Sequence, residues 1–314
     1  MAGEGFTFSF ALDGAAPAPA SADIASPTAL KEKATGNFDF IENVAALMRE
    51  EATQQLKSSV ALTFSDAEPL LKVRNQAQTD EAIYDELERQ GTDIIPGTYE
   101  GGLKLWECSL DLCRYIWKQR DHLKIEYVLE LGCGHGLPGC LILRNGVQND
   151  IPTNVLFADF NGFVLKDVTL PNILLNIGGL SIEKVANSVV FGAGDWLEMG
   201  RRLEEGQHDL PALPRDGRFD LLLAAETTYT AEASEDTALL LANHLAIDGV
   251  GLVATKRYYF GCGGGSDAFR KASATKQVSI EGTSCGLNIQ TVEVYDCGSG
   301  NIRELLKVVL QVVL

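Results

Sequence analysis

The sequence predicts a doubly wound α/β fold with a mostly parallel sheet. Short apolar runs alternate with segments of helical periodicity, a glycine-rich turn follows one run, and two runs near the chain end flank a hairpin signal. Residues 219–225 form the clearest run, because a strand covered on both faces is almost continuously apolar. Strands alternating with helices and closing in a hairpin predict an antiparallel pair at one edge.

The individual elements follow in chain order. Pro171 must start, kink or end part of its segment because proline lacks a backbone N–H. Gly298–Asn301 is the hairpin signal. The predicted helices are 41–51, 80–89, 137–145, 164–176 and 237–245; the predicted strands begin at 59, 127, 154, 189, 219, 250, 289 and 305.

Composition divides the 314-residue chain into three parts. Residues 1–36 are rich in Ala, Pro, Gly and Ser, so they cannot bury enough apolar surface to offset ordering, and we predict a disordered tail. Residues 37–92 form an extension that packs on the core, and residues 93–314 form one enzyme-sized domain. The tail resembles neither a signal nor a transit peptide, and no apolar run reaches membrane-spanning length. We therefore expect a cytoplasmic and nuclear location.

The net charge and the cysteine spacing limit which partners and metal sites we expect. A formal net charge of −17 argues against direct nucleic-acid binding, which needs a basic surface, and favours encounter with a basic protein. The seven cysteines form no C-x-x-C pair and the four histidines are scattered, so we expect reduced thiols and no metal site. We expect a monomer.

The glycine-rich turn, YVLELGCGHGLPG at 127–139, is typical of a nucleotide-type cofactor site. Gly134, Gly136 and Gly139 match the dinucleotide pattern G-x-G-x-x-G, with Asp159 about 20 residues beyond. Read from Glu130, the same loop fits S-adenosylmethionine. A carboxylate opposes a pyrophosphate but attracts the ammonium of the methionine moiety, so Glu130 favours the methyl donor. The glycines alone could also build only a tight turn.

Acidic residues end three successive apolar runs. Glu130, Asp159 and Asp195 are suited to the amine, the ribose hydroxyls and the adenine of S-adenosylmethionine, and Trp196 could stack on the adenine ring. Each residue alone is equally compatible with an ordinary polar strand end. Together they match the methyl donor better than a dinucleotide.

Four segments resemble the histidine protein methyltransferases, a group within the seven-strand methyltransferases that act on protein side chains. The resemblance spans roughly 93–314 and has two departures: His135 stands where a small hydroxyl residue is usual, and Thr228 where an aliphatic residue is expected. The matching segments are IPGTYEGGLKLWEC at 95–108, the glycine loop, AETTY at 225–229 and KRYYFGCGGG at 256–265.

Strand position and resemblance together nominate the site residues. Glu226 follows the fourth core strand, where it could accept an N–H from a substrate imidazole and so select the reactive tautomer; helix capping is the alternative role. The resemblance implies that the segment containing Trp106, with Pro96 and Gly97 turning into it, crosses the cofactor mouth; the alternative role of Trp106 is a core anchor. The expected catalytic residues are Glu226 and Tyr229; the expected substrate-binding residues are Tyr258, Tyr259, Phe260 and Gly263; the expected cofactor-binding residues are Trp106, Glu107, Cys108, Glu130, Gly132, Gly134, Gly136, Asp159, Phe160, Asn161, Gly194, Asp195, Trp196 and Ala225.

Three functions stay open from sequence. The first is protein-histidine N-methylation with S-adenosylmethionine, yielding S-adenosylhomocysteine; the resemblance implies a basic, large-subunit ribosomal protein as substrate. The second is methylation of lysine or a small molecule on the same fold. The third is a non-catalytic cofactor-binding adaptor of a ribosomal protein.

Overall fold

The computed structural model describes residues 36–53, 59–63, 69–74, 86–87, 89, 93–95, 98–120, 125–177, 181–206, 210–296, 298 and 300–313. These residues belong to one compact unit, Thr35–Leu314. The predicted tail, Pro96, Gly97 and most of the predicted helix 80–89 lie outside the described residues, so the three-part division stays a prediction.

A nine-stranded sheet forms the centre of this unit, with strand order β1-β6-β5-β4-β7-β8-β11-β10-β9. Strands β4 to β8 are mutually parallel, whereas β1, β11, β10 and β9 pair antiparallel to their neighbours. A separate antiparallel pair joins β2 to β3. The strands are β1 Phe38–Phe40, β2 Ser59–Thr63, β3 Pro69–Arg74, β4 Tyr127–Leu131, β5 Asn154–Asp159, β6 Val189–Gly194, β7 Phe219–Ala225, β8 Leu245–Lys256, β9 Gln277–Ile280, β10 Thr283–Asp296 and β11 Ile302–Val312.

The predicted seven-strand sheet with a C-terminal antiparallel hairpin is confirmed. Its strands run from β6 to β10 in the spatial order, and β1 and β9 extend it by one short strand at each edge. The strand order reverses between β4 and β7, which pair directly but are separated in the chain by β5 and β6. Open α/β sheets bind ligands beyond the carboxyl ends of the strands at such a reversal.

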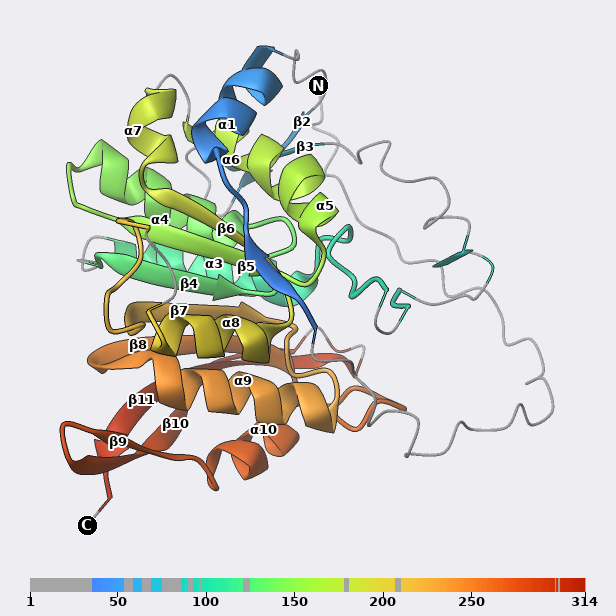
Figure 1. The fold of residues 1–314 in the computed structure, drawn as a ribbon. Coiled ribbons are helices and arrows are strands. Elements are labelled where there is room, and N and C mark those ends of the chain that lie inside the picture. Colours follow the sequence, from blue (N-terminus) through green and yellow to red (C-terminus); the bar gives the residue numbers. More distant parts are fainter. Residues whose placement is uncertain are drawn as a thin grey trace. The chain divides into compact units, whose positions relative to one another are not determined.

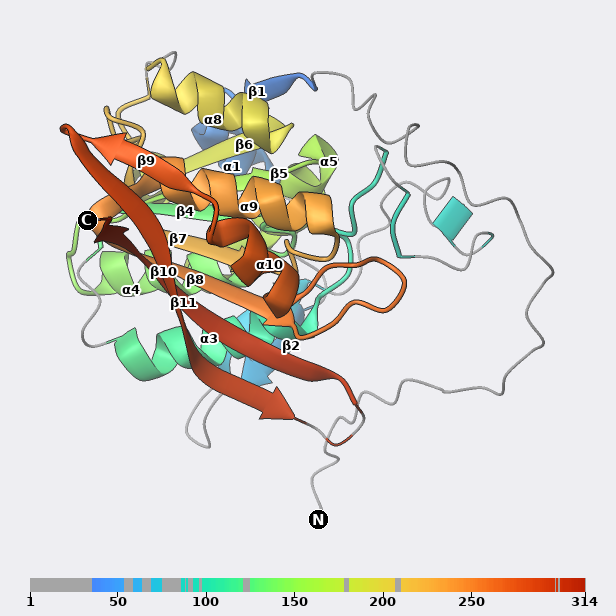
Figure 2. The same ribbon diagram turned by 90° about the horizontal axis from the view of Figure 1, so that it is seen from below.

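Helices cover both faces of the sheet (Figures 1 and 2). One apolar cluster joins α1, α3, α4, α6 and α7 to one face, and a second joins α8, α9 and α10 to the other. The helices are α1 Val44–Thr53, α3 Glu107–Gln119, α4 Leu137–Gln148, α5 Gly162–Val164, α6 Leu170–Ile177, α7 Ile182–Ala186, α8 Trp196–Glu204, α9 Ala231–His244 and α10 Ser266–Ser273. None of the helices in the described ranges is both long and apolar enough to cross a bilayer.

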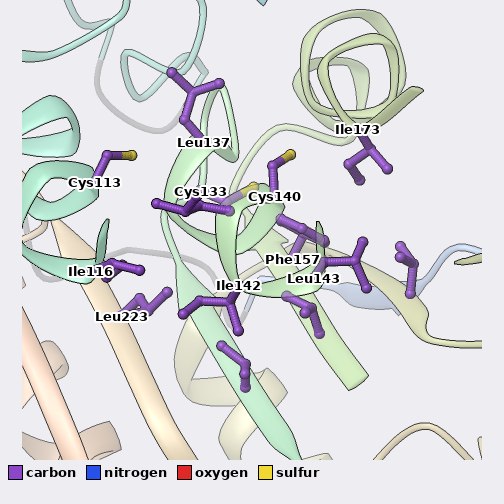
Figure 3. Packing of buried hydrophobic residues seen from close by; sticks show 14 of the residues in the cluster. Cys113, Ile116, Cys133, Leu137, Cys140, Ile142, Leu143, Phe157, Ile173 and Leu223 are labelled. Carbon is purple, nitrogen blue, oxygen red and sulfur yellow. The ribbon is translucent and has the colours of Figure 1, made fainter. Parts of the chain in front are cut away.

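Four cysteines belong to the first of these clusters: Cys108, Cys113, Cys133 and Cys140. Cys113, Cys133 and Cys140 are buried among leucine, isoleucine and phenylalanine side chains (Figure 3), and all three thiols are free. Burial raises the pKa of each thiol well above its usual value. They act as small apolar side chains, which agrees with the expectation of reduced thiols.

Pro171 is the second residue of α6, so of the predicted roles it has that of starting a helical segment. Residues Leu165–Thr169 form a π-helical turn between α5 and α6, and the Leu170 N–H donates to the carbonyl of Leu165. The wider turn accommodates a residue that cannot donate to the preceding turn. Two other predicted elements were too short. The helix predicted from 237 begins at Ala231, where the Thr230 hydroxyl caps α9, and the strand predicted from 250 begins at Leu245 as β8.

Candidate active site

The predicted site residues come together beyond the carboxyl ends of the parallel strands. The glycine loop follows β4, Asp159 ends β5, Asp195 follows β6, and Glu226 follows β7. Residues 98–106 lie against the same edge, because Gly102 approaches both Gly134 and Asp159. The strand reversal between β4 and β7 therefore places the glycine loop beside Glu226.

The glycine loop needs glycine for its backbone conformation. Gly132, Gly134 and Gly136 have φ values of 60°, 48° and 64°, a region that costs other residues about 1–2 kcal/mol. Gly139 has a different role: a Cβ there would lie 2.5 Å from both Glu130 Oε2 and a ring carbon of Phe157. Three glycines thus shape the loop, and the fourth lets α4 pack on the sheet.

Glu130 does not reach the mouth of the loop as the sequence suggested. Its side chain is 3% exposed, and Oε2 accepts the N–H of Gly139 at 2.8 Å. Burial raises the pKa of Glu130 to about 8, against the lowering effect of the Gly139 N–H. Glu130 therefore occupies a helix N-terminal donor that a pyrophosphate would need, so it still opposes a dinucleotide but for a different reason.

Asp159 ties the loop to the end of β5. Its Oδ2 accepts from Gly134 N at 2.9 Å and its Oδ1 from Asn161 N at 3.0 Å. Burial raises the pKa of Asp159 to about 6. Asn161 in turn joins this strand end to the preceding segment, because its side chain accepts from Glu100 N and donates to the carbonyl of Thr98. Phe160, between them, is half-buried.

Asp195 is the N-cap of α8. Its Oδ1 accepts from Leu197 N at 2.9 Å and Glu198 N at 3.0 Å, which satisfies two donors at the helix start. Gly194 precedes it with φ 125°. The Trp196 ring packs on the glycine loop, since a Cβ at Gly132 would lie 3.1 Å from its Cζ2 atom.

Trp106, Glu107 and Cys108 lie where α3 begins. Trp106 donates from Nε1 to the carbonyl of Gly101 at 3.0 Å. Glu107 is bonded to the turn between β10 and β11, because Asn301 Nδ2 donates to its Oε2 at 2.8 Å. Cys108 is fully buried beside Glu226, and burial with this neighbouring carboxylate raises the pKa of its thiol.

Glu226 has the most unusual surroundings of the candidates. It is 9% exposed and has φ 59°, a conformation that carries strain for a residue with a Cβ. Oε2 accepts the hydroxyl of Tyr259 and lies 3.6 Å from Lys256 Nζ. Oε1 is buried, and no donor among the described residues bonds to it. One carboxylate oxygen is thus fixed and the other is available.

Tyr229 and Tyr259 both donate to carboxylates. The Tyr229 hydroxyl donates to Glu100 Oε2, which links the end of β7 to the segment before α3. Burial and Glu100 raise the pKa of Tyr229, and burial and Glu226 raise that of Tyr259. Both phenols therefore stay protonated near neutral pH, and the Tyr229 contact favours a positioning role over the predicted catalytic one.

The predicted substrate-binding residues 258–260 differ in their exposure to solvent. Phe260 is 89% exposed and Tyr258 is 57% exposed, whereas Tyr259 turns inward to Glu226. Gly263 forms an isolated bridge with Thr230, and the N–H of Gly265 donates to the carbonyl of Thr228 at 2.8 Å. The glycine-rich loop therefore packs on the chain after β7. Ala225, the last residue of β7, is half-buried.

Sequence reasoning did not assign roles to Glu100 or Lys256. Lys256 ends β8 and lies inside a segment already singled out, so its position as a charged strand end was the available signal. Thr228, which departs from the family pattern, shares a 2.6 Å hydrogen bond with Thr255 and is fully buried. The aliphatic preference at this position is thus replaced by a satisfied polar pair.

The arrangement fits S-adenosylmethionine. Trp196 Nε1, beside the glycine loop, and His135 Nδ1, within it, are buried without hydrogen-bond partners among the described residues. Burial lowers the pKa of His135 to about 4, so its ring is neutral. Two buried nitrogens without partners suit a polar ligand, and the Trp196 indole suits a stacked aromatic base. Within the described ranges, no group of three or more His, Cys, Asp or Glu residues could hold a metal ion.

Comparison with known proteins identifies the family. A family model described as "Lysine methyltransferase" matches residues 96–261, more than half of the chain. The "Histidine protein methyltransferase 1 homolog" of Dictyostelium discoideum is 36% identical over 217 residues, which cover 69% of this chain and 60% of that protein. The rat homologue of the same name is 33% identical over 223 residues, covering 66% and 56%.

The chain spans 56–60% of the length of these two curated relatives. Among solved structures, the N-methyltransferase NodS from Bradyrhizobium japonicum in complex with S-adenosyl-L-homocysteine has a TM-score of 0.41 and 13% identity, covering 72% of this chain and 96% of that chain. The relatives confirm the resemblance to histidine protein methyltransferases, and the expected cofactor agrees with it. By the match over residues 96–261, the chain belongs to the methyltransferase family that this model describes.

Proposed function

We propose that this chain is a protein-histidine N-methyltransferase that uses S-adenosylmethionine. The observation that carries the proposal is Glu226, whose Oε1 is buried and unpartnered while Oε2 is held by Tyr259 and Lys256. A carboxylate oxygen kept free in a buried site is suited to accept one N–H from a neutral donor. The imidazole of histidine has such a donor and carries its reactive lone pair on the other ring nitrogen.

The bound cofactor supplies an electrophilic methyl group on a sulfonium. Glu226 accepts the N–H of one imidazole nitrogen, which fixes the tautomer and leaves the lone pair of the other nitrogen facing the methyl group. With the donor bound, transfer would join that nitrogen to the methyl group and would leave the electron pair of the broken S–C bond on sulfur. The positive charge moves to the imidazole ring, where Glu226 stabilises it, and the N–H proton later passes to the carboxylate or to water.

Positioning contributes more than acid strength. An unperturbed histidine has a pKa of about 6.5, so its imidazole is already a neutral nucleophile at physiological pH. The in-line geometry instead requires both reactants to be held, and well-oriented reactions gain several kcal/mol in this way. The Tyr229–Glu100 and Asn161–Thr98 hydrogen bonds fix the segment before α3 against the strand ends, which supports that role.

We propose a basic protein substrate, with a large-subunit ribosomal protein as the first candidate. The net charge of −17 favours encounter with a basic partner and argues against direct nucleic-acid binding. The exposed rings of Tyr258 and Phe260, which flank the Glu226 partner Tyr259 in the chain, would contact the substrate around the acceptor. We further propose that the protein acts as a monomer in the cytoplasm and nucleus.

Labelling of a cell extract tests this function. The extract is treated with the purified protein and isotopically labelled S-adenosylmethionine, and mass spectrometry assigns the labelled residues. We expect label on histidine of a basic protein. Label confined to lysine, or to small molecules, would overturn the proposal. Label on histidine of an acidic protein would overturn only the substrate class.

Cofactor choice has a separate test. Isothermal titration should show binding of S-adenosylhomocysteine and no heat with NAD, because Glu130 already occupies the Gly139 N–H that a pyrophosphate would use. Binding of NAD without a response to S-adenosylhomocysteine would contradict the methyltransferase assignment at this site.

Lysine methylation is the second candidate, since the matching family model carries that description. A lysine must lose a proton from its ammonium before it can attack the methyl group. Glu226 Oε1 could accept that proton, but the Lys256 ammonium 3.6 Å from Oε2 would repel a second ammonium at the same carboxylate. The contact between these two residues therefore weighs against lysine.

A further inference from the structure

Lys256 is the one lysine whose ammonium reaches Glu226 within the described part of the chain. Its Nζ lies 3.6 Å from Glu226 Oε2 and the side chain is 20% exposed. The same nitrogen lies 5.2 Å from the ring centroid of Trp106 and 5.3 Å from that of Tyr259. Distances of this size are typical of cation–π contacts, so two aromatic faces hold the ammonium beside the carboxylate.

This arrangement gives the two oxygens of Glu226 different surroundings. Oε2 receives the Tyr259 hydroxyl and the Lys256 charge, and Oε1 receives no hydrogen bond from the described residues. The nearest cation already offsets the carboxylate charge. A neutral N–H group at Oε1 would gain a hydrogen bond, whereas an incoming ammonium would meet the field of Lys256 at close range.

We propose that Lys256 determines acceptor specificity: its ammonium fills the cation position of Glu226 and so excludes substrate lysine while admitting a neutral imidazole. The inference rests on the proposed function and adds to it the residue that discriminates between the two acceptors. Specificity of this kind comes from repulsion of the wrong partner as much as from contacts with the right one.

Replacement of Lys256 should relax this discrimination. In Lys256→Met the aliphatic stem remains but the charge is gone, so a substrate ammonium can pair with Glu226 and pass a proton to it. The resulting free amine can then attack: its lone pair forms the N–C bond, the S–C bond breaks, and the electron pair stays on sulfur. The remaining amine proton is lost to water.

The experiment compares two acceptors. The probes are the protein that becomes labelled in the cell extract and the same protein with its acceptor histidine changed to lysine, each with isotopically labelled S-adenosylmethionine. The measured quantity is the ratio of kcat/KM for the histidine acceptor to that for the lysine acceptor. We expect Lys256→Met to lower this ratio by roughly 10- to 100-fold, in line with the cost of juxtaposed like charges.

Two further variants separate charge from packing. Lys256→Arg keeps the cation, and we expect it to retain the preference for histidine. Lys104→Met is the matched control, because Lys104 Nζ also lies over Trp106, at 4.5 Å, but forms its ion pair with Asp93 at 2.7 Å. It should leave the ratio unchanged. Equal loss of discrimination in Lys104→Met would overturn the proposal.

The outcomes distinguish this proposal from the proposed function. If the wild-type protein labels lysine and no histidine, the function itself fails. If the wild type prefers histidine and Lys256→Met keeps the same ratio, the function stands and the role of Lys256 is overturned. Titration with S-adenosylhomocysteine and thermal unfolding of each variant show that a changed ratio comes from a folded, cofactor-binding protein.

Discussion

The two halves of the strand-end site use their carboxylates differently. On the β4–β6 side, Glu130, Asp159 and Asp195 each accept at least one backbone N–H. On the β7–β8 side, the partners of Glu226 Oε2 are side chains, those of Tyr259 and Lys256. Its Oε1 receives no hydrogen bond from the described residues. The first half uses acids to hold the chain in place, and the second leaves one carboxylate oxygen without a partner, as the proposed chemistry requires.

This difference has an energetic counterpart. A buried carboxylate that accepts backbone N–H groups recovers part of its desolvation cost, whereas an unpartnered buried oxygen costs about 1–3 kcal/mol. Glu226 also carries a positive φ, which adds a further cost of about 1–3 kcal/mol. Residues in strained backbone conformations cluster at functional sites. Glu226 is therefore the residue to test first.

The largest expected effect is that of Glu226→Gln on turnover. The amide can still accept the imidazole N–H but has no charge to stabilise the imidazolium, so kcat should fall by roughly 10²- to 10³-fold. Affinity for S-adenosylhomocysteine, measured by titration, should not change. Glu232→Gln removes a nearby exposed acid at the start of α9 and is the control. Full activity in Glu226→Gln would remove the distinction between the two halves.

Glu130→Gln should alter the pH dependence of stability. The folded-state pKa of Glu130 is about 8, above its ordinary value of 4.5. The folded protein therefore binds a proton that the unfolded chain has released, and the free energy of unfolding falls as pH rises from about 4.5 to 8. In the wild-type protein this loss of unfolding free energy should be on the order of 2 kcal/mol or more between these pH values, and in Glu130→Gln it should be absent.

Urea unfolding at several pH values measures this effect. Asp159→Asn provides a comparison, because the pKa of Asp159 is raised only to about 6 and its contribution should be lost between about 4 and 6. If the free energy of unfolding depends on pH equally in the wild type and in Glu130→Gln, then Glu130 is solvated, contrary to its burial under α4.

Phe260→Ala tests whether the exposed side of the second half contacts substrate. The ring is 89% exposed, so the free energy of unfolding should change by less than about 0.5 kcal/mol. We expect KM for the protein acceptor to rise by about tenfold, as for loss of an aromatic contact residue. Val294→Ala removes another exposed apolar side chain, on β10, and should leave KM unaltered. A drop in stability instead would assign Phe260 to the core.

The smallest expected effect distinguishes the two roles of Asp195. Asp195→Ala removes the cap of α8 and should lower the free energy of unfolding by about 1 kcal/mol. Asp195→Asn can still cap the helix and should restore most of that stability. If affinity for S-adenosylhomocysteine falls in both variants, Asp195 also binds the cofactor; if it falls only in the alanine variant, the cap alone supports the site.

Much of the fold could be predicted from sequence because its signals are local. The continuous apolar run of β7, the positive-φ glycines after β4 and the turn between β10 and β11 each depend on neighbouring residues. The short edge strands could not be predicted in this way. β1 has three residues and pairs with β6 more than 150 residues later, so its pairing depends on packing that no local pattern reports.

The sequence by itself determined which residues end the strands, and therefore that Glu130, Asp159, Asp195 and Glu226 would gather at one edge. Strand periodicity and chain order are enough for that, because parallel strands share their carboxyl edge. The tertiary structure alone decided what each carboxylate does there. The docking of α4 turns Glu130 inward, the start of α8 engages Asp195, and β8 brings Lys256 to Glu226; such contacts depend on distances between elements that are remote in sequence.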